Sequence, residues 1–579
     1  MGLLLAGAAS AGTQPTALAA LHRSGQTFVT WTESVDPSVE SYRVYRYDQP
    51  IDSLNLGSAV FLQEVWEESG EFYADRYYKP VPDTWAPRYL TRFVITNGGP
   101  ELAAGTGLLV WTLDEVDLGG GTSGSGYYAV TSVDDMGVEN VVNFTAANSI
   151  GPVSEQVDLP EPVLATTAVA GTHEIYTQFM DLRSWNPTMD APGPNFNHFG
   201  LNPSAAGVQN SIQYAYNYEV VPPYAGGCSN LGTLKPLVLV LHGHGGHKFR
   251  PATVDDDPNW CDAFRIYPID ISNSWWFGFA QDHDYRTGLP PTTGDTIENF
   301  TEQRLLRMVK DLLRHPVYGA QIDPERIFVT GHSMGATGTM SLAMRYPDVF
   351  AAAYASQPMT DHESSVPSPQ YDWVADATAK WGSPADNLPV AFGEVEGEDV
   401  HIAPYAGTGV WDWQDHQANF TSRVADPMAP FGVTHGFLDT VLEFSTQGAP
   451  AFTAYEASRQ SWAGTVENVM HVPTPHEGLP PTMGEDLNGL PFAGFSVVRS
   501  ESVPAFSATD TNPPIPPTGP EQYHYDVEWS ASWNDFDGAP IDSLPLWGIT
   551  LRSLDATTRT MDVTPRRLQS FRVQTGQLY

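Results

Sequence analysis

Positive charge is scarce in this sequence. The 579 residues include 28 Lys and Arg against 68 Asp and Glu, which gives a formal net charge of −40 at pH 7. Lysine is the rarer cation and occurs only at positions 79, 235, 248, 310 and 380. Nucleic-acid phosphates require a basic surface, so the composition excludes a nucleic-acid-binding protein. Because few cations are available to pair with the carboxylates, we expect an acidic and well-solvated surface.

Cysteine is also nearly absent. The two cysteines, Cys228 and Cys261, flank the segment LKPLVLVLHGHGG. In an exported protein, a pair this close in sequence predicts one disulfide, and two buried thiols are the alternative.

Long apolar runs are missing as well. None reaches the ~18 residues that a membrane-spanning helix needs, so we predict no membrane span. The start, MGLLLAGAASAGTQP, has a short apolar run and an Ala9-Ser10-Ala11 triplet typical of a cleavage site, without a basic region before them. We interpret residues 1–14 as the remainder of a signal peptide and predict a secreted protein, extracellular or periplasmic.

The chain is too long for one hydrophobic core, so we predict several domains. Residues 15–160 contain the strand-like segments TFVTWTE, ESYRVYRY, GLLVWTLDEV and GYYAVTSVDDMGVEN. The glycine-rich GGGTSGSG at 119–126 predicts a flexible hairpin-type connection. The run YYAVTSVDDMGVEN resembles the penultimate strand and following turn of fibronectin type III domains, which implies a seven-stranded β-sandwich in this part of the chain.

Strand and helix patterns alternate after a predicted linker at 151–167. Strands are predicted in IQYAYNYEVV, PLVLVLHG and AFRIYPID, and an amphipathic helix is predicted in TEQRLLRMVKDLLRHP. This alternation predicts an α/β sheet domain over residues 170–485.

Strand patterns return beyond residue 490, in AGFSVVRSE, YHYDVEWSASW, LWGITLRSL and LQSFRVQTG. The proline-rich TNPPIPPTGP at 511–520 predicts an extended loop among them. We therefore predict a small C-terminal β domain over 490–579. Its basic pair, Arg566 and Arg567, is too small for a binding patch and suggests no function.

The stretch RIFVTGHSMGATGTMSLAMRYPDVF combines a short buried strand with a helix of small and apolar residues. Ser333 lies between them, on a turn of the form Gly-x-Ser-x-Gly. A serine alcohol becomes a nucleophile only when it is exposed and a neighbouring base takes its proton. Gly331 and Gly335 remove side chains that would clash at so sharp a bend. We predict that Ser333 is a catalytic nucleophile.

This turn and the upstream LVLVLHGHGG resemble the α/β-hydrolase superfamily over about residues 205–480. The resemblance implies an oxyanion hole of two backbone N–H groups, one from Met334 just after the nucleophile and one from His244 in the HGHGG loop. His242 and His244 also suggest a metal site, but no clear third ligand lies nearby in the sequence, so we prefer a role in loop geometry.

The superfamily order of nucleophile, acid and histidine places the other two catalytic residues downstream. The segment APFGVTHGFLDTVLEF resembles the acid loop of these hydrolases and implies Asp439 as the acid. A predicted helix and a strand ending at His471 follow, which implies His471 as the base. Asp399 and His476 remain the alternative acid and base, and we interpret His435 as a structural residue of the acid loop.

Aromatic residues gather in SNSWWFGFAQDHDY, after the predicted strand AFRIYPID. Trp275, Trp276 and Phe277 could line an acyl or aromatic subsite at the sheet edge where ligands bind, or they could fill the core beneath the loop. The acidic clusters VDDDPNW and WNDFDG lack the spacing of a calcium loop. The chemistry implied above needs no metal, and we predict no cofactor.

Taken together, these features resemble secreted esterases and depolymerases, including polyhydroxybutyrate depolymerases and feruloyl esterases. The resemblance implies a serine carboxylic-ester hydrolase that forms an acyl-enzyme on an ester substrate, polymeric or aromatic. The usual cysteine of that branch beside the oxyanion loop is absent here. One alternative is a prolyl-oligopeptidase-like serine peptidase, although the N-terminal strands are too few for a β-propeller and show no repeat. The other is a binding protein on an inactive hydrolase scaffold.

Overall fold

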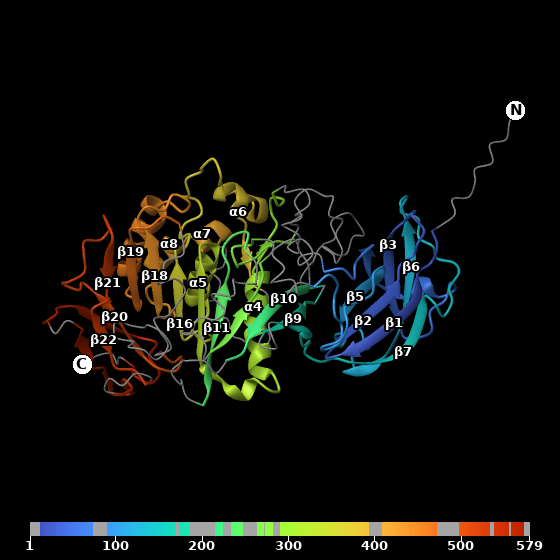
Figure 1. The fold of residues 1–579 in the computed structure, drawn as a ribbon, viewed down its shortest axis with the longest axis horizontal. Coiled ribbons are helices and arrows are strands. Elements are labelled where there is room, and N and C mark those ends of the chain that lie inside the picture. Colours follow the sequence, from blue (N-terminus) through green and yellow to red (C-terminus); the bar gives the residue numbers. More distant parts are fainter. Residues whose placement is uncertain are drawn as a thin grey trace. The chain divides into compact units, whose positions relative to one another are not determined.

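The computed structural model describes residues 12–72, 90–168, 173–181, 183, 215–223, 233–246, 263–270, 273–281, 290–392, 408–471, 497–532, 538–554 and 557–572. Cys228, Cys261, Asp399 and His476 lie outside these ranges, and so does most of the predicted signal peptide. The chain divides into two compact units, Met1–Asn217 with Asp284–Thr287 and Tyr218–His283 with Gly288–Tyr579. Figure 1 traces the chain through both.

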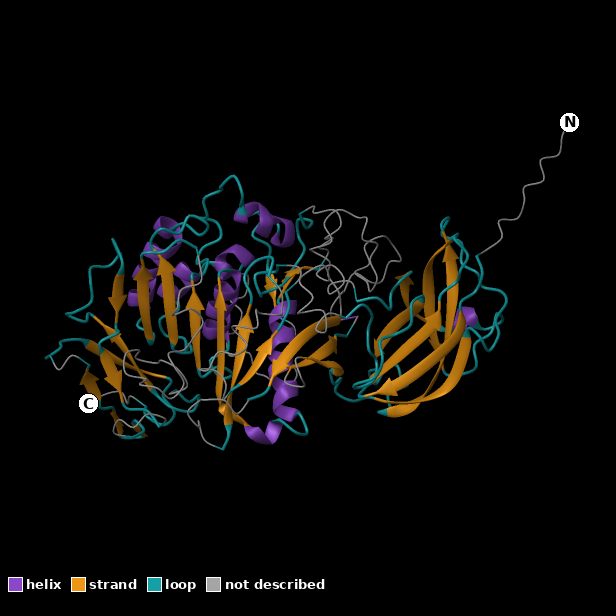
Figure 2. Ribbon diagram, viewed as in Figure 1, coloured by secondary structure: helices purple, strands orange, loops and turns teal. Residues whose placement is uncertain are grey.

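The N-terminal unit contains two antiparallel sheets (Figure 2). The first has the order β1-β2-β5, formed by Thr16–Arg23, Gln26–Thr32 and Thr106–Thr112. The second has the order β4-β3-β6-β7, formed by Val60–Trp66, Val39–Tyr47, Ser123–Asp134 and Ser149–Gln156. Trp31 of the first sheet and Tyr42 of the second are buried, with their rings 5.5 Å apart. The strands predicted in this part of the chain are therefore present, and they share a core.

The glycine-rich segment 119–126 is not the hairpin that the sequence predicts. It joins β5 to β6, which belong to different sheets. Gly119 and Gly120 have φ angles of 66° and 90°, which glycine adopts without strain, and from Ser123 the segment is already strand, paired opposite Gln156.

The predicted linker 151–167 also contributes strands. Its first part belongs to β7, and its last part lies in β8 (Val163–Ala168), which pairs antiparallel with β9 (His173–Phe179). Gly151 and Pro152, residue types common in turns, lie within the edge strand β7.

The second unit is built on one mixed sheet, in which the order is β21-β19-β18-β16-β15-β11-β12-β10. In that order the strands are Glu521–Tyr523, Trp462–Glu467, Phe431–Gly436, Ala352–Ser356, Ile322–His332, Lys235–Leu241, Phe264–Tyr267 and Ala215–Val221. All pairs from β19 to β12 are parallel, whereas β21 and β10 pair antiparallel with their neighbours. This mixed parallel sheet is typical of α/β hydrolases and confirms the predicted α/β class.

Six α-helices connect the strands within the described part of this unit. They are α4 (Phe300–Arg314), α5 (Met334–Arg345), α6 (Trp373–Trp381), α7 (Val410–Gln414), α8 (His416–Ser422) and α9 (Ala449–Ser458). Helix α4 confirms the predicted amphipathic helix, and α5 packs on β11, β15 and β16. Three short strands form a small second sheet in the order β13 (Phe279–Ala280), β14 (Ile297–Glu298) and β17 (Val390–Ala391). Among the described residues, no helix is long and apolar enough to cross a membrane.

The C-terminal strands do not form the separate domain that the sequence predicts over 490–579. They belong to the same compact unit as the central sheet, which β21 extends beside β19. Tyr523 of β21 is buried and stacks on Trp462, with ring centroids 6.1 Å apart. The other pairs are β20 (Val503–Ser507) with β26 (Asp562–Arg566), β22 (Val527–Trp529) with β25 (Leu551–Ser553), and β23 (Ile541–Ser543) with β24 (Leu546–Gly548).

The basic pair to which the sequence suggests no function joins these strands to the rest of the unit. Arg567 donates hydrogen bonds to the carbonyl oxygens of Ala351, Val498 and Glu501, at 2.8, 2.8 and 2.9 Å. Arg566 donates to the carbonyl oxygen of Val424 at 2.8 Å. Both side chains therefore satisfy carbonyl groups that belong to distant segments.

A buried ion pair links α4 to α5. Arg345 near the end of α5 and Glu302 in the first turn of α4 are 1% and 0% exposed, and the guanidinium donates to the carboxylate. The guanidinium also lies over the rings of Trp413 and Phe277, 4.6 and 4.9 Å from their centroids. The two helices that precede and follow β15 in the sequence are therefore linked directly.

Replacing Arg345 should therefore destabilise the second unit strongly. Arg345→Met leaves Glu302 as an unpaired buried carboxylate, and we expect the free energy of unfolding to fall by about 3–5 kcal/mol. The double variant Arg345→Met/Glu302→Gln removes both charges, keeps an acceptor for the Tyr346 hydroxyl, and should recover most of the loss. Urea unfolding of the three proteins measures this; a single variant as stable as the parent would contradict it.

Candidate active site

Loops at one edge of the central sheet bring the predicted catalytic residues together. The loop 242–246 follows β11, Ser333 follows β15, Asp439 follows β18, and His471 follows β19. Because these strands are parallel, their carboxyl ends meet at the same edge, where ligands bind in sheets of this kind.

Ser333 lies at the turn from β15 into α5, as the sequence predicts. Its φ and ψ are 57° and −123°, a left-handed conformation that is strained for a residue with a side chain. The turn is held by two backbone hydrogen bonds, from Ser333 N to Ser356 O at 2.9 Å and from Thr337 N to Ser333 O at 3.0 Å. Neighbouring structure therefore stabilises a backbone conformation in which the hydroxyl reaches His471.

The glycines on either side of Ser333 are required by close backbone contacts. A Cβ at Gly335 would lie 2.2 Å from the carbonyl oxygen of Leu241, and one at Gly331 would lie 2.4 Å from the carbonyl carbon of Gly335. No side chain fits at these separations, so the Gly-x-Ser-x-Gly pattern reflects the crossing of β11, β15 and α5.

Ser333, His471 and Asp439 form one continuous hydrogen-bonded series. The distance from His471 Nε2 to Ser333 Oγ is 2.8 Å, and that from His471 Nδ1 to Asp439 Oδ2 is 2.6 Å. A carboxylate oxygen only accepts, so Nδ1 carries the ring proton and Nε2 presents its lone pair to the serine hydroxyl. This arrangement allows His471 to remove the proton of Ser333 as the hydroxyl attacks.

Asp439 is held by its own loop. Its side chain is fully buried, and Oδ1 accepts hydrogen bonds from the backbone N–H groups of Val441 and Leu442 at 2.8 and 2.9 Å. Leu438 N donates to Val469 O at 3.0 Å, which ties the acid loop to the segment before His471. The carboxylate is thus held by backbone donors and oriented toward the imidazole.

The loop 242–246 lies directly beside the nucleophile. A Cβ at Gly243 would lie 3.5 Å from the Cβ of Ser333. His242 Nε2 accepts from Asp270 N at 2.9 Å, so Nδ1 bears the proton and donates to Gly243 O at 2.8 Å. Both ring nitrogens of His242 therefore hold neighbouring backbone, which agrees with the role in loop geometry that the sequence favours.

Met334 is the first residue of α5, where backbone N–H groups have no acceptor within the helix. The loop that carries His244 lies beside Ser333, and the pairing of the Met334 and His244 amides as an oxyanion hole stays a prediction from the resemblance. Two such donors are the requirement for stabilising negative charge on a substrate oxygen.

Trp275, Trp276 and Phe277 are 1%, 0% and 0% exposed. The indole N–H of Trp276 donates to His242 O at 3.0 Å, and that of Trp275 donates to Asp376 Oδ2 at 2.9 Å. This burial favours packing beneath the loop over substrate contact, which were the two roles that the sequence left open.

His435 lies beneath the acid loop and is completely buried. Neither ring nitrogen has a hydrogen-bond partner among the described residues. Burial lowers the pKa of His435 to about 4, and the nearby Asp439 only partly offsets this effect. His435 is therefore neutral at pH 7, in agreement with a structural role.

Two contacts of the site have no clear signal in the sequence. The ring of His332 lies 4.9 Å from that of His471, and Asp376 of α6 lies 3.5 Å from His244 Nε2. The spacing of Asp376 and Lys380 indicates a helical ion pair, but nothing local points to His244. No group of three or more His, Cys, Asp or Glu side chains in the described ranges is arranged to hold a metal ion.

Comparison with known proteins gives one family match. The model of the prolyl oligopeptidase family matches residues 309–392, from within α4 through the turn at Ser333 to the residue after β17. A search of curated proteins gives no match.

Several solved structures are similar at low identity. An S-formylglutathione hydrolase from Agrobacterium tumefaciens is 13% identical over 54% of this chain and 93% of its own, with a TM-score of 0.31. An acetyl xylan esterase from Aspergillus awamori is 16% identical over 48% and 94%, with a TM-score of 0.25. A fungal esterase from Rhizomucor miehei is 15% identical over 45% of this chain and 75% of its own, with a TM-score of 0.30. Values this low carry no argument about substrate.

The topology of the sheet, the turn at Ser333 and the family match agree with one another. The second unit contains a serine-hydrolase catalytic region on a mixed parallel sheet of the α/β-hydrolase type, and residues 309–392 within it are similar to the prolyl oligopeptidase family.

Asp439→Asn should lower kcat by about 10⁴-fold with KM nearly unchanged, because the histidine loses the acceptor that fixes its tautomer. Asp399→Asn is the matched control, since the sequence left Asp399 as the alternative acid. Steady-state kinetics of both variants on one ester decide between them. A large loss in Asp399→Asn with a small loss in Asp439→Asn would reverse the assignment.

The buried neutral His435 should make stability fall in mild acid. In the unfolded chain His435 is protonated near pH 6.5, whereas in the folded protein it stays neutral down to about pH 4. The free energy of unfolding therefore falls as the pH drops through this window. We expect His435→Leu, which cannot be protonated, to lose about 2 kcal/mol less than the parent between pH 7 and pH 5. Urea unfolding of both proteins at pH 7 and pH 5 measures this. If the free energy of unfolding falls by the same amount in the parent and in His435→Leu, the prediction is wrong.

Proposed function

We propose that the protein is a secreted serine carboxylic-ester hydrolase. The observation that supports this most directly is the hydrogen-bonded series of Ser333, His471 and Asp439, with distances of 2.8 and 2.6 Å. Secretion is proposed from the sequence, from the apolar start and the acidic composition.

The reaction follows from these positions. Ser333 Oγ attacks the ester carbonyl carbon while its proton passes to His471 Nε2, and negative charge develops on the carbonyl oxygen beside the amides of Met334 and His244. When the carbon–oxygen bond breaks, the imidazolium returns the proton to the leaving alcohol and an acyl-enzyme remains. Water then attacks the acyl-enzyme in the same way, and it releases the carboxylic acid and restores the serine.

The substrate class is proposed from the resemblance to depolymerases and feruloyl esterases, as a polyester or a plant-wall or aromatic ester. The N-terminal unit supports this in part. Its two antiparallel sheets, of three and four strands, together have the seven strands expected of a fibronectin type III-like module, and β8 and β9 follow them in the chain. We propose that this module acts as a spacer or stabilising neighbour of the catalytic unit.

Serine peptidase activity is the second candidate. The match of residues 309–392 to the prolyl oligopeptidase family favours it, because the matched stretch includes the nucleophile. Peptide hydrolysis uses the same acyl-enzyme chemistry but must protonate an amine leaving group, so the two activities separate on paired substrates.

The wild-type protein should hydrolyse p-nitrophenyl esters and methyl ferulate, and it should leave a prolyl p-nitroanilide peptide essentially uncleaved. Ser333→Ala should retain less than about one-thousandth of the ester activity, since triads depend strongly on the nucleophile. Peptide turnover at rates similar to ester turnover would establish the peptidase instead. A fluorophosphonate that fails to label Ser333 would point to an inactive binding scaffold.

A further inference from the structure

Helix α6 presents one face to the active-site loops. Trp373, Asp376, Ala377, Lys380 and Trp381 recur at helical spacing on that face, and all but Asp376 are buried. The helix starts at Asp372, whose carboxylate caps it by accepting from Ala375 N at 3.0 Å.

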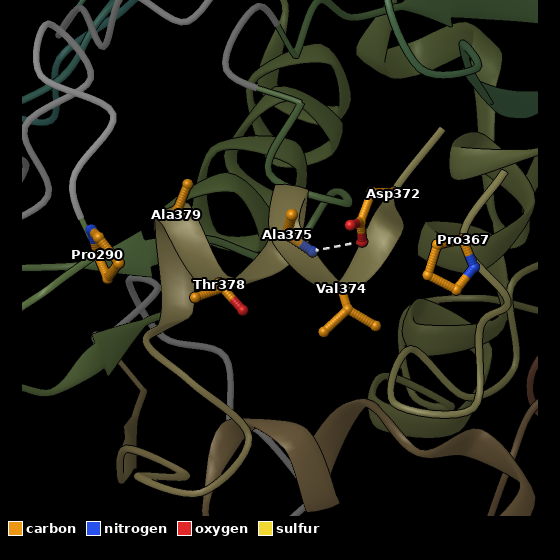
Figure 3. Close-up of a pocket in the computed structure, with 7 residues that line it drawn as sticks. All are labelled: Pro290, Pro367, Asp372, Val374, Ala375, Thr378 and Ala379. Carbon is orange, nitrogen blue, oxygen red and sulfur yellow. Dashed lines mark hydrogen bonds between the residues drawn. The ribbon is translucent and has the colours of Figure 1, made fainter. Parts of the chain in front are cut away.

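The opposite face of α6 borders a cavity that contains none of the predicted catalytic residues. Figure 3 shows Val374, Ala375 and Thr378 on this face, which lines a cavity of about 520 Å³ together with Pro290 and Pro367. The two faces therefore differ in what they contact, and substitutions on the cavity side serve as controls for those on the other.

Asp376 makes three contacts from the inner face. Oδ1 lies 2.6 Å from Lys380 Nζ and 3.5 Å from His244 Nε2, and Oδ2 accepts from Trp275 Nε1 at 2.9 Å. Burial alone would raise the pKa of Asp376, but Lys380 and His244 outweigh it and hold that pKa well below its usual value. The carboxylate is therefore ionised and fixed from three directions.

His244 belongs to the loop beside Ser333 and is packed against the same helix. Its ring lies 5.0 Å from that of Trp373 and 6.2 Å from that of Trp275. The rest of the loop is held through the backbone by Asn273, which accepts from Gly245 N at 2.8 Å, and by Trp276 at His242 O. Asp376 is thus the polar partner of the one side chain in this loop that reaches α6.

The same helix also contacts the acid loop. Trp373 Nε1 donates to Val441 O at 3.0 Å, and Val441 N donates to Asp439 Oδ1 at 2.8 Å. A single helix therefore supports the loop on the oxyanion side of Ser333 and the loop that holds the acid.

We propose that Asp376 is a positioning residue, whose carboxylate holds the His244 side chain and so fixes the loop whose N–H completes the oxyanion hole. This inference rests on the proposed hydrolase function. It assigns to α6 a role in transition-state stabilisation without any contact between Asp376 and substrate.

A double-mutant cycle on ester turnover tests the pair. His244→Ala keeps the backbone N–H but removes the ring, and Asp376→Asn removes the charge that holds it. Each should lower kcat about ten- to a hundredfold with KM changed less than about twofold, because a displaced donor weakens the transition state more than the ground state. The double variant should be no slower than the slower single variant, since both remove one interaction.

Because Asp376→Asn leaves Lys380 unpaired, Asp376→Asn/Lys380→Met serves as a second variant with both charges removed. It should show the same loss of kcat while keeping the parent's circular dichroism and unfolding midpoint. Thr378→Val, on the cavity face of α6, should keep the parent's kcat.

A trifluoromethyl ketone that forms an oxyanion on Ser333 gives an independent readout. Its inhibition constant should rise in parallel with the loss of kcat in each variant. Effects of His244→Ala and Asp376→Asn that multiply, or a change in KM alone, would overturn the proposal. Absence of ester and peptide turnover in the wild type would instead count against the hydrolase function itself, so the two failures are distinguishable.

Discussion

The active site depends on a steric constraint: the backbone at the end of β11 passes the start of α5 so closely that only glycine fits at position 335. The Leu241 carbonyl oxygen would lie 2.2 Å from a Cβ there. This crossing sets the HGHGG loop beside Ser333. The strained φ of Ser333 is maintained because β16 and α5 both hydrogen-bond its backbone. The positions of His471 and Asp439 matter only because the serine hydroxyl is presented to them in this way.

Features encoded in local sequence were predicted well. The apolar spacing in TEQRLLRMVKDLLRHP corresponds to α4, and the strand, turn and helix around Ser333 correspond to β15 and α5. The strand predicted to end at His471 is shorter, since β19 ends at Glu467, yet the order of elements that placed Asp439 and His471 is present. Steric demands on glycine and the period of a helix are local properties, which is why a single sequence reveals them.

Features set by distant contacts were not predictable in the same way. The sequence leaves open whether the tryptophans at 275 and 276 line a subsite or fill the core, and in the structure their indole groups donate to Asp376 and His242. The strands after residue 490 look like a separate domain, but Tyr523 packs on Trp462 of the central sheet. Several of the few cationic side chains are buried, which the sequence does not indicate: Arg265, Arg304, Arg326 and Arg345 are at most 1% exposed.

Strand β21 has a consequence for how the protein behaves at high concentration. A long, flat strand at the edge of a parallel sheet offers unpaired backbone groups to other molecules and promotes aggregation. Here the long strand β19 is covered, and the strand left beyond it in this sheet consists only of Glu521–Tyr523 and begins with a carboxylate. So short and charged an edge is a poor template for intermolecular pairing.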